Sequence, residues 1–182
     1  MPTLDITKSQ LMESLQDFAL EFATPALVDV DHAVIGFVNN ATPPKDGNDF
    51  VVITPLSQTR VGTNAESDDD PTSDTVTLSE YVQCEIQLDC YSRKRKNARL
   101  RAQTYETIAR SGPGARFFRR YGIDCQFASP CQNLTAVMDS GQYVSRWTTT
   151  LTVGFWKQVS TGQDYFTDVK PELVNVDIRF KP

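Results

Sequence analysis

The sequence predicts an α+β fold: an antiparallel sheet of about five strands with an N-terminal helix and one further helix packed on it, plus a protruding acidic arm or hairpin and a C-terminal strand. Three observations support this class. Apolar residues recur at helical spacing near the N-terminus, several later segments alternate apolar and polar residues, and an alanine stripe follows one of those segments. With 182 residues, 40% of them hydrophobic, the chain is large enough to bury a core as one domain over residues 1–182.

The first element is an amphipathic helix that begins after the candidate cap Ser9 and ends before Pro25. Its apolar residues share one face: Leu11, Leu15, Phe18 and Phe22. Because only one stripe is apolar, this helix must pack against another element.

The next strand is predicted in "FVVITPLSQTRVG", where Pro55 favours a sheet edge or a bulge. Residues 63–80, "TNAESDDDPTSDTVTLSE", are acidic and have no period, which predicts an exposed arm or hairpin tip. A calcium loop is the alternative, but the acids are contiguous, no central glycine supplies the turn, and no glutamate stands at the twelfth position.

Residues 82–90 alternate cleanly between apolar and polar, which predicts a half-buried strand. A helix follows from Lys94 to about Arg110 and ends at "SGPG", residues 111–114, a segment that does not open a helix. The inward face of this helix carries Ala98, Ala102, Tyr105 and Ala109, and the residues mostly off it are Arg95, Arg99, Arg101 and Glu106. The small side chains predict close packing of the helix on the sheet.

Three further strands are expected. Ile123, Cys125 and Phe127 alternate toward the core, and residues 142–159 form the longest strand, paired with a strand that ends near Ala136. Residues 171–182 form a C-terminal strand extension, which completes its own sheet or adds to that of a neighbouring molecule. The alternating residues of this partner-docking strand are Val174, Val176, Ile178 and Phe180.

The residues that carry chemistry are few. Four cysteines stand in two pairs with a spacing of six, unlike zinc ligands: Cys84 and Cys90, then Cys125 and Cys131. Six strand residues separate the first two by roughly 20 Å, so they cannot share a metal, and we expect four reduced thiols. The single histidine, His32, is expected at the surface or in a turn. No catalytic residue, metal or cofactor is predicted. A hydrolase is the least favoured class, because we identify no nucleophile and base in the sequence.

The charge distribution is uneven. Residues 93–120 contain ten Lys or Arg and one acid, whereas the rest of the chain contains eight basic and 22 acidic residues. We expect the basic segment to meet acidic residues of a neighbouring copy, although phosphate is an open alternative. The candidate subunit-interface residues are Arg93, Arg95, Arg99 and Arg101, with Asp68, Asp69 and Asp70.

Localisation is predicted from what the sequence lacks. It contains no run of about 18 apolar residues and no signal-peptide layout, so we expect a soluble chain made in a cytoplasm, without membrane contact.

The order of elements over residues 9–169 resembles the neck and tail-terminator proteins of long-tailed bacteriophages. The likeness rests on "NDFVVITPLSQTRVGTN", "VQCEIQLDCYSRKRKNARLRAQTYETIA", "SPCQNLTAVMDSGQYVSRWTTTLTVGFW" and "DYFTDV". It implies a structural virion protein, not an enzyme, that forms a hexameric ring in the neck. This ring terminates the tail and joins it to the head connector. Its partners would be the connector, the tail tube and the sheath, with genomic DNA passing through the lumen without specific binding.

Two alternatives remain open. The first is a head-completion or connector ring, which is more often dodecameric. The second, from another class, is a nucleic-acid-binding accessory protein, because a basic helix with nearby aromatic residues could contact a phosphate backbone. The acidic segment and the strand after Pro171 depart from the family and could serve docking specific to one virion.

Overall fold

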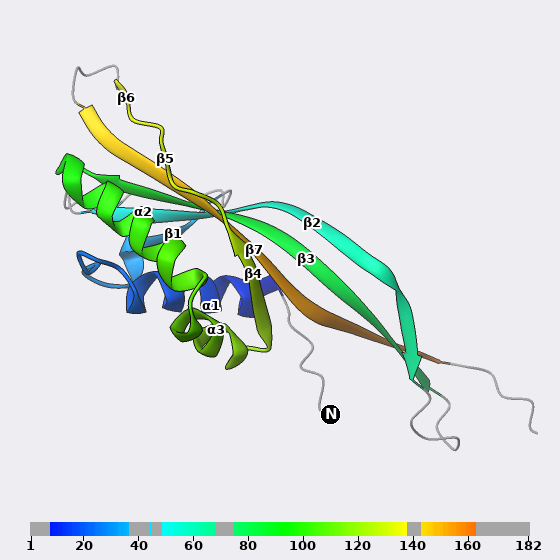
Figure 1. Cartoon of the computed structure of the whole chain (residues 1–182). Coiled ribbons are helices and arrows are strands. Elements are labelled where there is room, and N and C mark those ends of the chain that lie inside the picture. Colours follow the sequence, from blue (N-terminus) through cyan, green and yellow to red (C-terminus); the bar gives the residue numbers. More distant parts are fainter. Residues whose placement is uncertain (1–7, 37–43, 45–48, 68–74, 138–142, 163–182) are drawn as a thin grey trace, which may run out of the picture.

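The computed structural model describes residues 8–36, 44, 49–67, 75–137 and 143–162. The predicted α+β class is confirmed: helices pack on one face of a twisted sheet, and the sheet continues beyond them as an arm (Figure 1). None of the helices in these ranges is long and apolar enough to cross a membrane.

The elements follow in this order: α1 (Lys8–Glu21), η1 (Val30–His32), β1 (Ala33–Ile35), β2 (Phe50–Ser67), β3 (Thr75–Ser92), α2 (Arg95–Ala109), α3 (Gly112–Arg119), β4 (Ile123–Ala128), β5 (Gln132–Asn133), β6 (Ala136–Val137) and β7 (Tyr143–Gly162). The strand order is β1-β2-β3-β7-β4, and β5 and β6 also pair with β7.

The sheet is antiparallel, as predicted, except at one edge, where a short parallel pairing makes it mixed. β1 pairs with β2 in parallel over three residues. Parallel neighbours need a connection that returns the chain to the same end, and residues 36–49 are long enough to do so. The other pairings in the described sheet are antiparallel, including the predicted pairing of β7 with the strand at Ala136.

The predicted alternation of β3 and β7 is confirmed. The inward residues of β3 are all buried: Val82, Cys84, Ile86, Leu88 and Cys90. They lie in register with inward residues of β7, so that Cys84 faces Val153 and Ile86 faces Leu151. One face of the sheet therefore forms the core, and no described helix covers the other face (Figure 1).

The helix layer is held together by aromatic residues. The predicted α2 stripe of Ala98, Ala102, Tyr105 and Ala109 is buried, as expected. Phe18 of α1 is fully buried, with its ring centroid 4.8 Å from that of Phe118 in α3 and 5.7 Å from that of Tyr105. The Tyr105 hydroxyl donates a hydrogen bond of 2.7 Å to the Ala19 carbonyl, so α1 is joined to α2 as well as packed on it.

Residues 111–114 both end one helix and open another, which corrects the prediction that they only end one. The Ser111 hydroxyl accepts a hydrogen bond from the Gly114 N–H, and Pro113 occupies the first turn of α3. Serine at an N-cap and proline in a first turn favour a helix start. A Cβ atom at Gly114 would overlap the Ile108 carbonyl, so only glycine lets α3 begin this close to α2.

β2 becomes an edge strand after its first residues. β1 covers only Val51 to Ile53, and the register against β3 shifts between Pro55 and Ser57. The prediction that Pro55 marks an edge or bulge is therefore confirmed. A second shift lies between Val61 and Ala65.

A bulge in β4 overturns part of the predicted core. The register against β7 shifts between Cys125 and Phe127, which leaves one extra residue in β4. An extra residue reverses the face of every side chain that follows. Ala128 is consequently buried, whereas Phe127, expected in the core, is 49% exposed.

The arm is made of β2, β3 and the last part of β7 (Figure 1). Residues 63–67 and 75–80 of the predicted arm form the far ends of β2 and β3. Asp68, Asp69 and Asp70 lie outside the described residues. The predicted C-terminal strand, with Val174, Val176, Ile178 and Phe180, also lies outside them.

Candidate functional site

A basic surface covers α2, α3 and the residues just before them. Its exposed members with described side chains are Arg93, Lys94, Lys96, Arg99, Arg110, Arg116, Arg119 and Arg120. Of the other predicted interface residues, Arg95 is the first residue of α2. Three guanidinium groups of this surface lie over aromatic rings: Arg99 at 5.4 Å from the Trp147 centroid, Arg110 at 5.8 Å from that of Phe127, and Arg120 at 5.7 Å from that of Phe117. These contacts fix part of the positive charge against the body of the protein.

Arg101 is buried, which corrects its placement on the exposed face of the helix. The side chain is 0% exposed. Its Nε and Nη2 donate to the Pro25 carbonyl at 3.1 and 2.8 Å, and Nη2 also donates to Asp49 Oδ2 at 3.2 Å. Position 101 follows Ala98 by three residues and precedes Tyr105 by four, so helical spacing alone indicated the inward face. Arg101 therefore joins α2 to two loops and cannot form part of a surface contact.

The uncovered face of the sheet is rich in serine, threonine and glutamine. Near the end of β3, Asp89 and Arg146 form an ion pair on this face, with Arg146 Nη2 donating to Asp89 Oδ2 at 2.9 Å and Nε to Oδ1 at 3.2 Å. Gln87 Nε2 donates to both carboxylate oxygens at 3.0 and 2.9 Å. The hydrogen bond from Arg146 to Asp89 raises the pKa of Arg146. The positive charge of Arg146 on this face is therefore balanced by Asp89 of the same chain.

An aromatic and amide cluster lies where this face passes into the arm. Gln83 Nε2 donates to Gln126 Oε1 at 2.7 Å, and Gln126 Nε2 donates to the Tyr81 hydroxyl oxygen at 2.9 Å. The Tyr81 ring meets the Trp156 ring edge-on at 5.3 Å between centroids. Gly154 lies beneath them, where a Cβ atom would overlap the Tyr81 hydroxyl. Trp156 stays 44% exposed, as expected of a contact surface.

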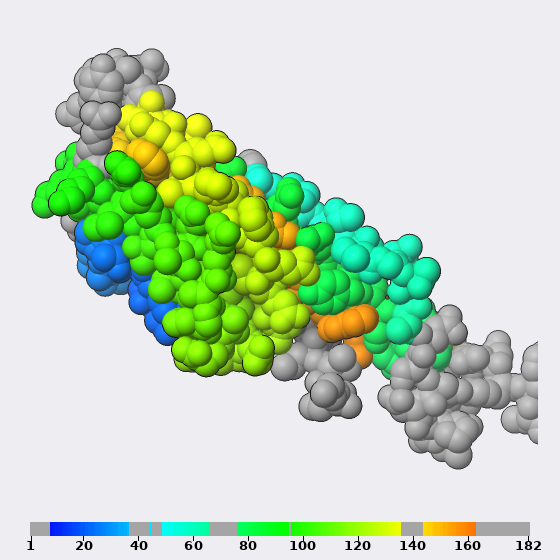
Figure 2. Space-filling view, in the orientation of Figure 1, coloured from blue at the N-terminus to red at the C-terminus, as the bar shows by residue number. Residues whose placement is uncertain are grey.

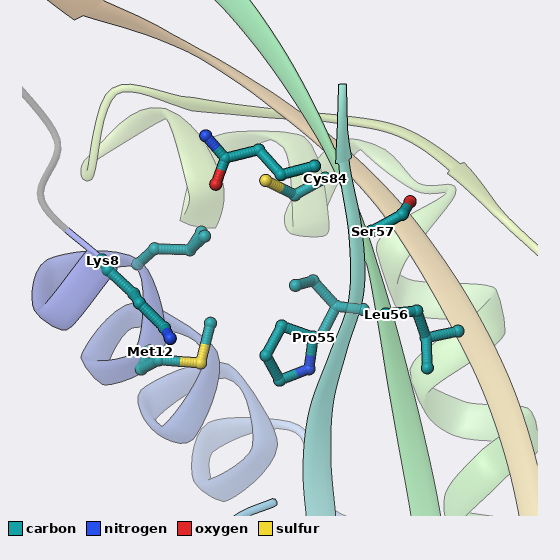
Figure 3. A pocket seen from close by; sticks show the side chains of 9 residues that line it. Lys8, Met12, Pro55, Leu56, Ser57 and Cys84 are labelled. Atoms are coloured by element: carbon teal, nitrogen blue, oxygen red, sulfur yellow. The ribbon is translucent and has the colours of Figure 1, made fainter. Parts of the chain in front are cut away.

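A hollow of about 270 Å³ opens between α1 and the bulged part of β2 (Figure 3). Met12 and Lys8 of α1 face Pro55 and Cys84 across it, whereas the Leu56 side chain extends from the other side of β2. The lining is mainly apolar. A second hollow, of about 280 Å³, lies beside β4 and is lined by Ala109, Arg110, Ser111, Ala115, Cys125, Gln126 and Phe127. Neither lining set contains a paired nucleophile and base.

The cysteines and the histidine fill structural positions. All four thiols are free. Burial raises the pKa of the Cys125 thiol to about 11, and burial together with the Glu106 carboxylate 3.2 Å away raises that of Cys131 to about 11. His32, expected at the surface or in a turn, lies in the short helix η1 and is buried, with Nδ1 2.7 Å from Asp29 Oδ1. Within the described ranges, no group of three or more His, Cys, Asp or Glu residues could hold a metal ion.

The described residues thus present a basic surface, an uncovered sheet face and two hollows whose linings contain no paired nucleophile and base. The space-filling view shows an elongated body with α2, α3 and the β4–β5 region on one side and the arm extending from it (Figure 2). A family model described as phage neck terminator protein matches residues 9–179. The comparison with curated proteins finds no match.

Proposed function

We propose that this chain, which belongs to the phage neck terminator family, forms a hexameric ring in the neck of the virion. The family is one of structural proteins of the phage neck, so the role is structural and virion-associated. In the proposal, the ring terminates the growing tail and joins it to the head connector, with DNA passing through the lumen. Assembly takes place in the host cytoplasm.

The observation that best supports a ring is that the two edges of the sheet are backed by different helices. The β4 side is backed by α2 and α3, whose surface is basic, and the β2 side is backed by α1. A ring requires a heterologous contact, in which one patch meets a different patch on the next copy. The exposed residues of α1 include Glu13, Asp17 and Glu21, which supplies the opposite sign. Such a chain suits a closed ring better than a two-fold dimer.

The uncovered sheet face supports a lumen through which DNA slides. Its cation Arg146 is neutralised by Asp89, and Glu85 and Asp124 add negative charge. In the proposal a wall of this kind does not attract phosphate, because the described residues of this face leave no unpaired cation to release counterions. We assign connector, tube or sheath docking to the segments with Asp68, Asp69 and Asp70 and with Val174, Val176, Ile178 and Phe180.

Light scattering and electron microscopy of the purified full chain test the ring. We expect six-fold rings, formed in solution or on purified tail tubes, and tails of abnormal length when the protein is absent. Twelve-fold rings would instead indicate the head-completion or connector alternative. A chain that stays monomeric in the presence of tubes would contradict the proposal.

Charge reversal separates assembly from nucleic-acid binding. We expect the variant Arg93→Glu, Arg95→Glu, Arg99→Glu to weaken ring formation without changing DNA retention, because in the proposal these arginines contact a neighbouring copy. If these arginines contacted phosphates, the slope of log affinity against log salt would fall by roughly one for each arginine lost. Circular dichroism checks that the variant is folded. Intact rings combined with a loss of DNA binding would favour the accessory protein.

A further inference from the structure

Among the described residues, two sheet edges on opposite sides of the body have no strand beside them. In the described part of the chain, β2 beyond Ile53 pairs only with β3, and β4 pairs only with β7. An unpaired edge presents a row of backbone N–H and C=O groups, to which another strand can add. The question is therefore which strand pairs with each edge in the assembled protein.

The free edges lie at the same level of the sheet. One row across the strands consists of Pro55, Ile86, Leu151 and Ala128. Another consists of Arg60, Val82, Phe155 and Ile123. β4 thus spans the same rows as residues 55–60 of β2. A second copy could be joined edge to edge without displacement along the strands.

The strand directions also match. β2 is antiparallel to β3, β3 to β7, and β7 to β4, so β4 runs opposite to β2. A neighbour related by rotation about an axis along the strands keeps these directions. Its β2 would meet β4 in antiparallel order, which continues the pattern of the sheet. Because Pro55 has no N–H, the regular edge available on β2 is residues 57–61, between the two register shifts.

Each edge also carries one exposed apolar side chain at a bulge. Leu56 and Phe127 are both 49% exposed. Phe127 shares its row with Thr152, Glu85 and Ser57, so it lies level with Leu56, which stands next to Ser57 at the opposite edge. Phe127 lies at the β4 edge, where the Arg110 guanidinium is 5.8 Å from its ring centroid, and Leu56 extends away from α1 (Figure 3). Joined edges would place the two side chains next to each other as a cross-strand apolar pair.

The charges on the helix side favour the same contact. α1 backs β1 and β2 and carries exposed Glu13. α2 and α3 back β7 and β4 and carry exposed Arg110 and Arg116. Joining the edges brings the acidic helix of one copy toward the basic helices of the next, which selects a second copy of this chain as the occupant.

From these matches we propose that β4 of one subunit adds to residues 57–61 of β2 in the next, with Phe127 packed on Leu56. The sheets then form one continuous antiparallel wall around the ring. This inference rests on the proposed ring and names its subunit contact. Because the two edges lie at the same level along the strands, each subunit joins the next without moving along the ring axis, and the ring can close. A shift along the axis from one subunit to the next would instead produce an open helical filament.

Complementary charges at the two positions test the contact. We expect Leu56→Asp and Phe127→Arg each to raise the concentration needed for ring formation by at least about tenfold, because each replaces one member of the apolar pair with a charged side chain. An equimolar mixture of the two variants should form rings again. If the variants alternate around a hexamer, three contacts pair the new aspartate with the new arginine, and the other three keep Leu56 against Phe127. The double variant in one chain should form rings alone.

The matched control is Val28→Asp, which adds the same charge at an apolar residue that is 66% exposed and distant in sequence from both edges. It should assemble like the unaltered protein. Unaltered chain that forms no ring would contradict the proposed function itself. If the unaltered chain forms rings and the Leu56→Asp and Phe127→Arg variants assemble normally, only the edge contact is overturned. The same conclusion follows if all variants are folded but neither the mixture nor the double variant regains ring formation.

Discussion

Substituting Arg101 with alanine is expected to lower the free energy of unfolding by about 3–5 kcal/mol. The guanidinium is completely buried and donates to the Pro25 carbonyl twice and to Asp49 once. Removing it leaves a buried carbonyl without these donors, a carboxylate without its cation, and a cavity under α2. Each of these consequences is destabilising.

Urea unfolding followed by circular dichroism measures this loss. Lys96→Ala, an exposed residue of the same helix, is the control and should change stability by no more than about 0.5 kcal/mol. Arg101→Lys should fall between them, because an ammonium keeps the charge but cannot reproduce the planar fork of donors. Equal stability of the Arg101→Ala and Lys96→Ala variants would show that Arg101 does not join α2 to the loops.

The long, regular elements were predictable because their residues keep one periodicity throughout, either the alternation of a strand or the spacing of a helix. The strand around Ile86 alternates without interruption, and the stripe containing Ala98 keeps helical spacing for three turns. Burial then follows from periodicity alone. The family could also be identified at this level, because its resemblance depends on the order of such elements.

The predictions failed where one residue changes the pattern. The extra residue in β4 moved Phe127 out of the core to the exposed β4 edge, and bulges leave little trace in a single sequence. Ser111 and Gly114 serve two helices at once, so the end of α2 concealed the start of α3. Arg101 was assigned by its charge although its spacing placed it inside.

The candidate contact surface was therefore only partly accessible from the sequence. The charge imbalance of residues 93–120 was visible and indicated the basic surface. The edge positions were not, because they depend on which strands lie outermost and on register shifts near Leu56 and Phe127. Strand order results from long-range pairing, which local patterns do not encode.

Phe18→Ala should reduce the free energy of unfolding by about 3–5 kcal/mol, the usual cost of removing a buried phenylalanine ring. The Phe18 ring centroid lies 4.8–5.7 Å from those of four other aromatic residues. These are Phe22, Tyr105, Phe117 and Phe118. Since they come from the α1 region, α2 and α3, the loss of one ring loosens the whole helix layer.

Chemical denaturation again measures the effect, with Glu13→Ala as the exposed control in the same helix. Phe18→Leu should cost less, because it keeps most of the buried apolar area and loses mainly the contacts between rings. The helix layer supports the inward face of the sheet, and β4 packs against α3, so a loosened layer also loosens one of the two free edges. Phe18→Ala should therefore impair ring formation even at concentrations and temperatures where the monomer remains folded. If assembly is unchanged while stability falls, the edges are held by the sheet alone and do not depend on the helices.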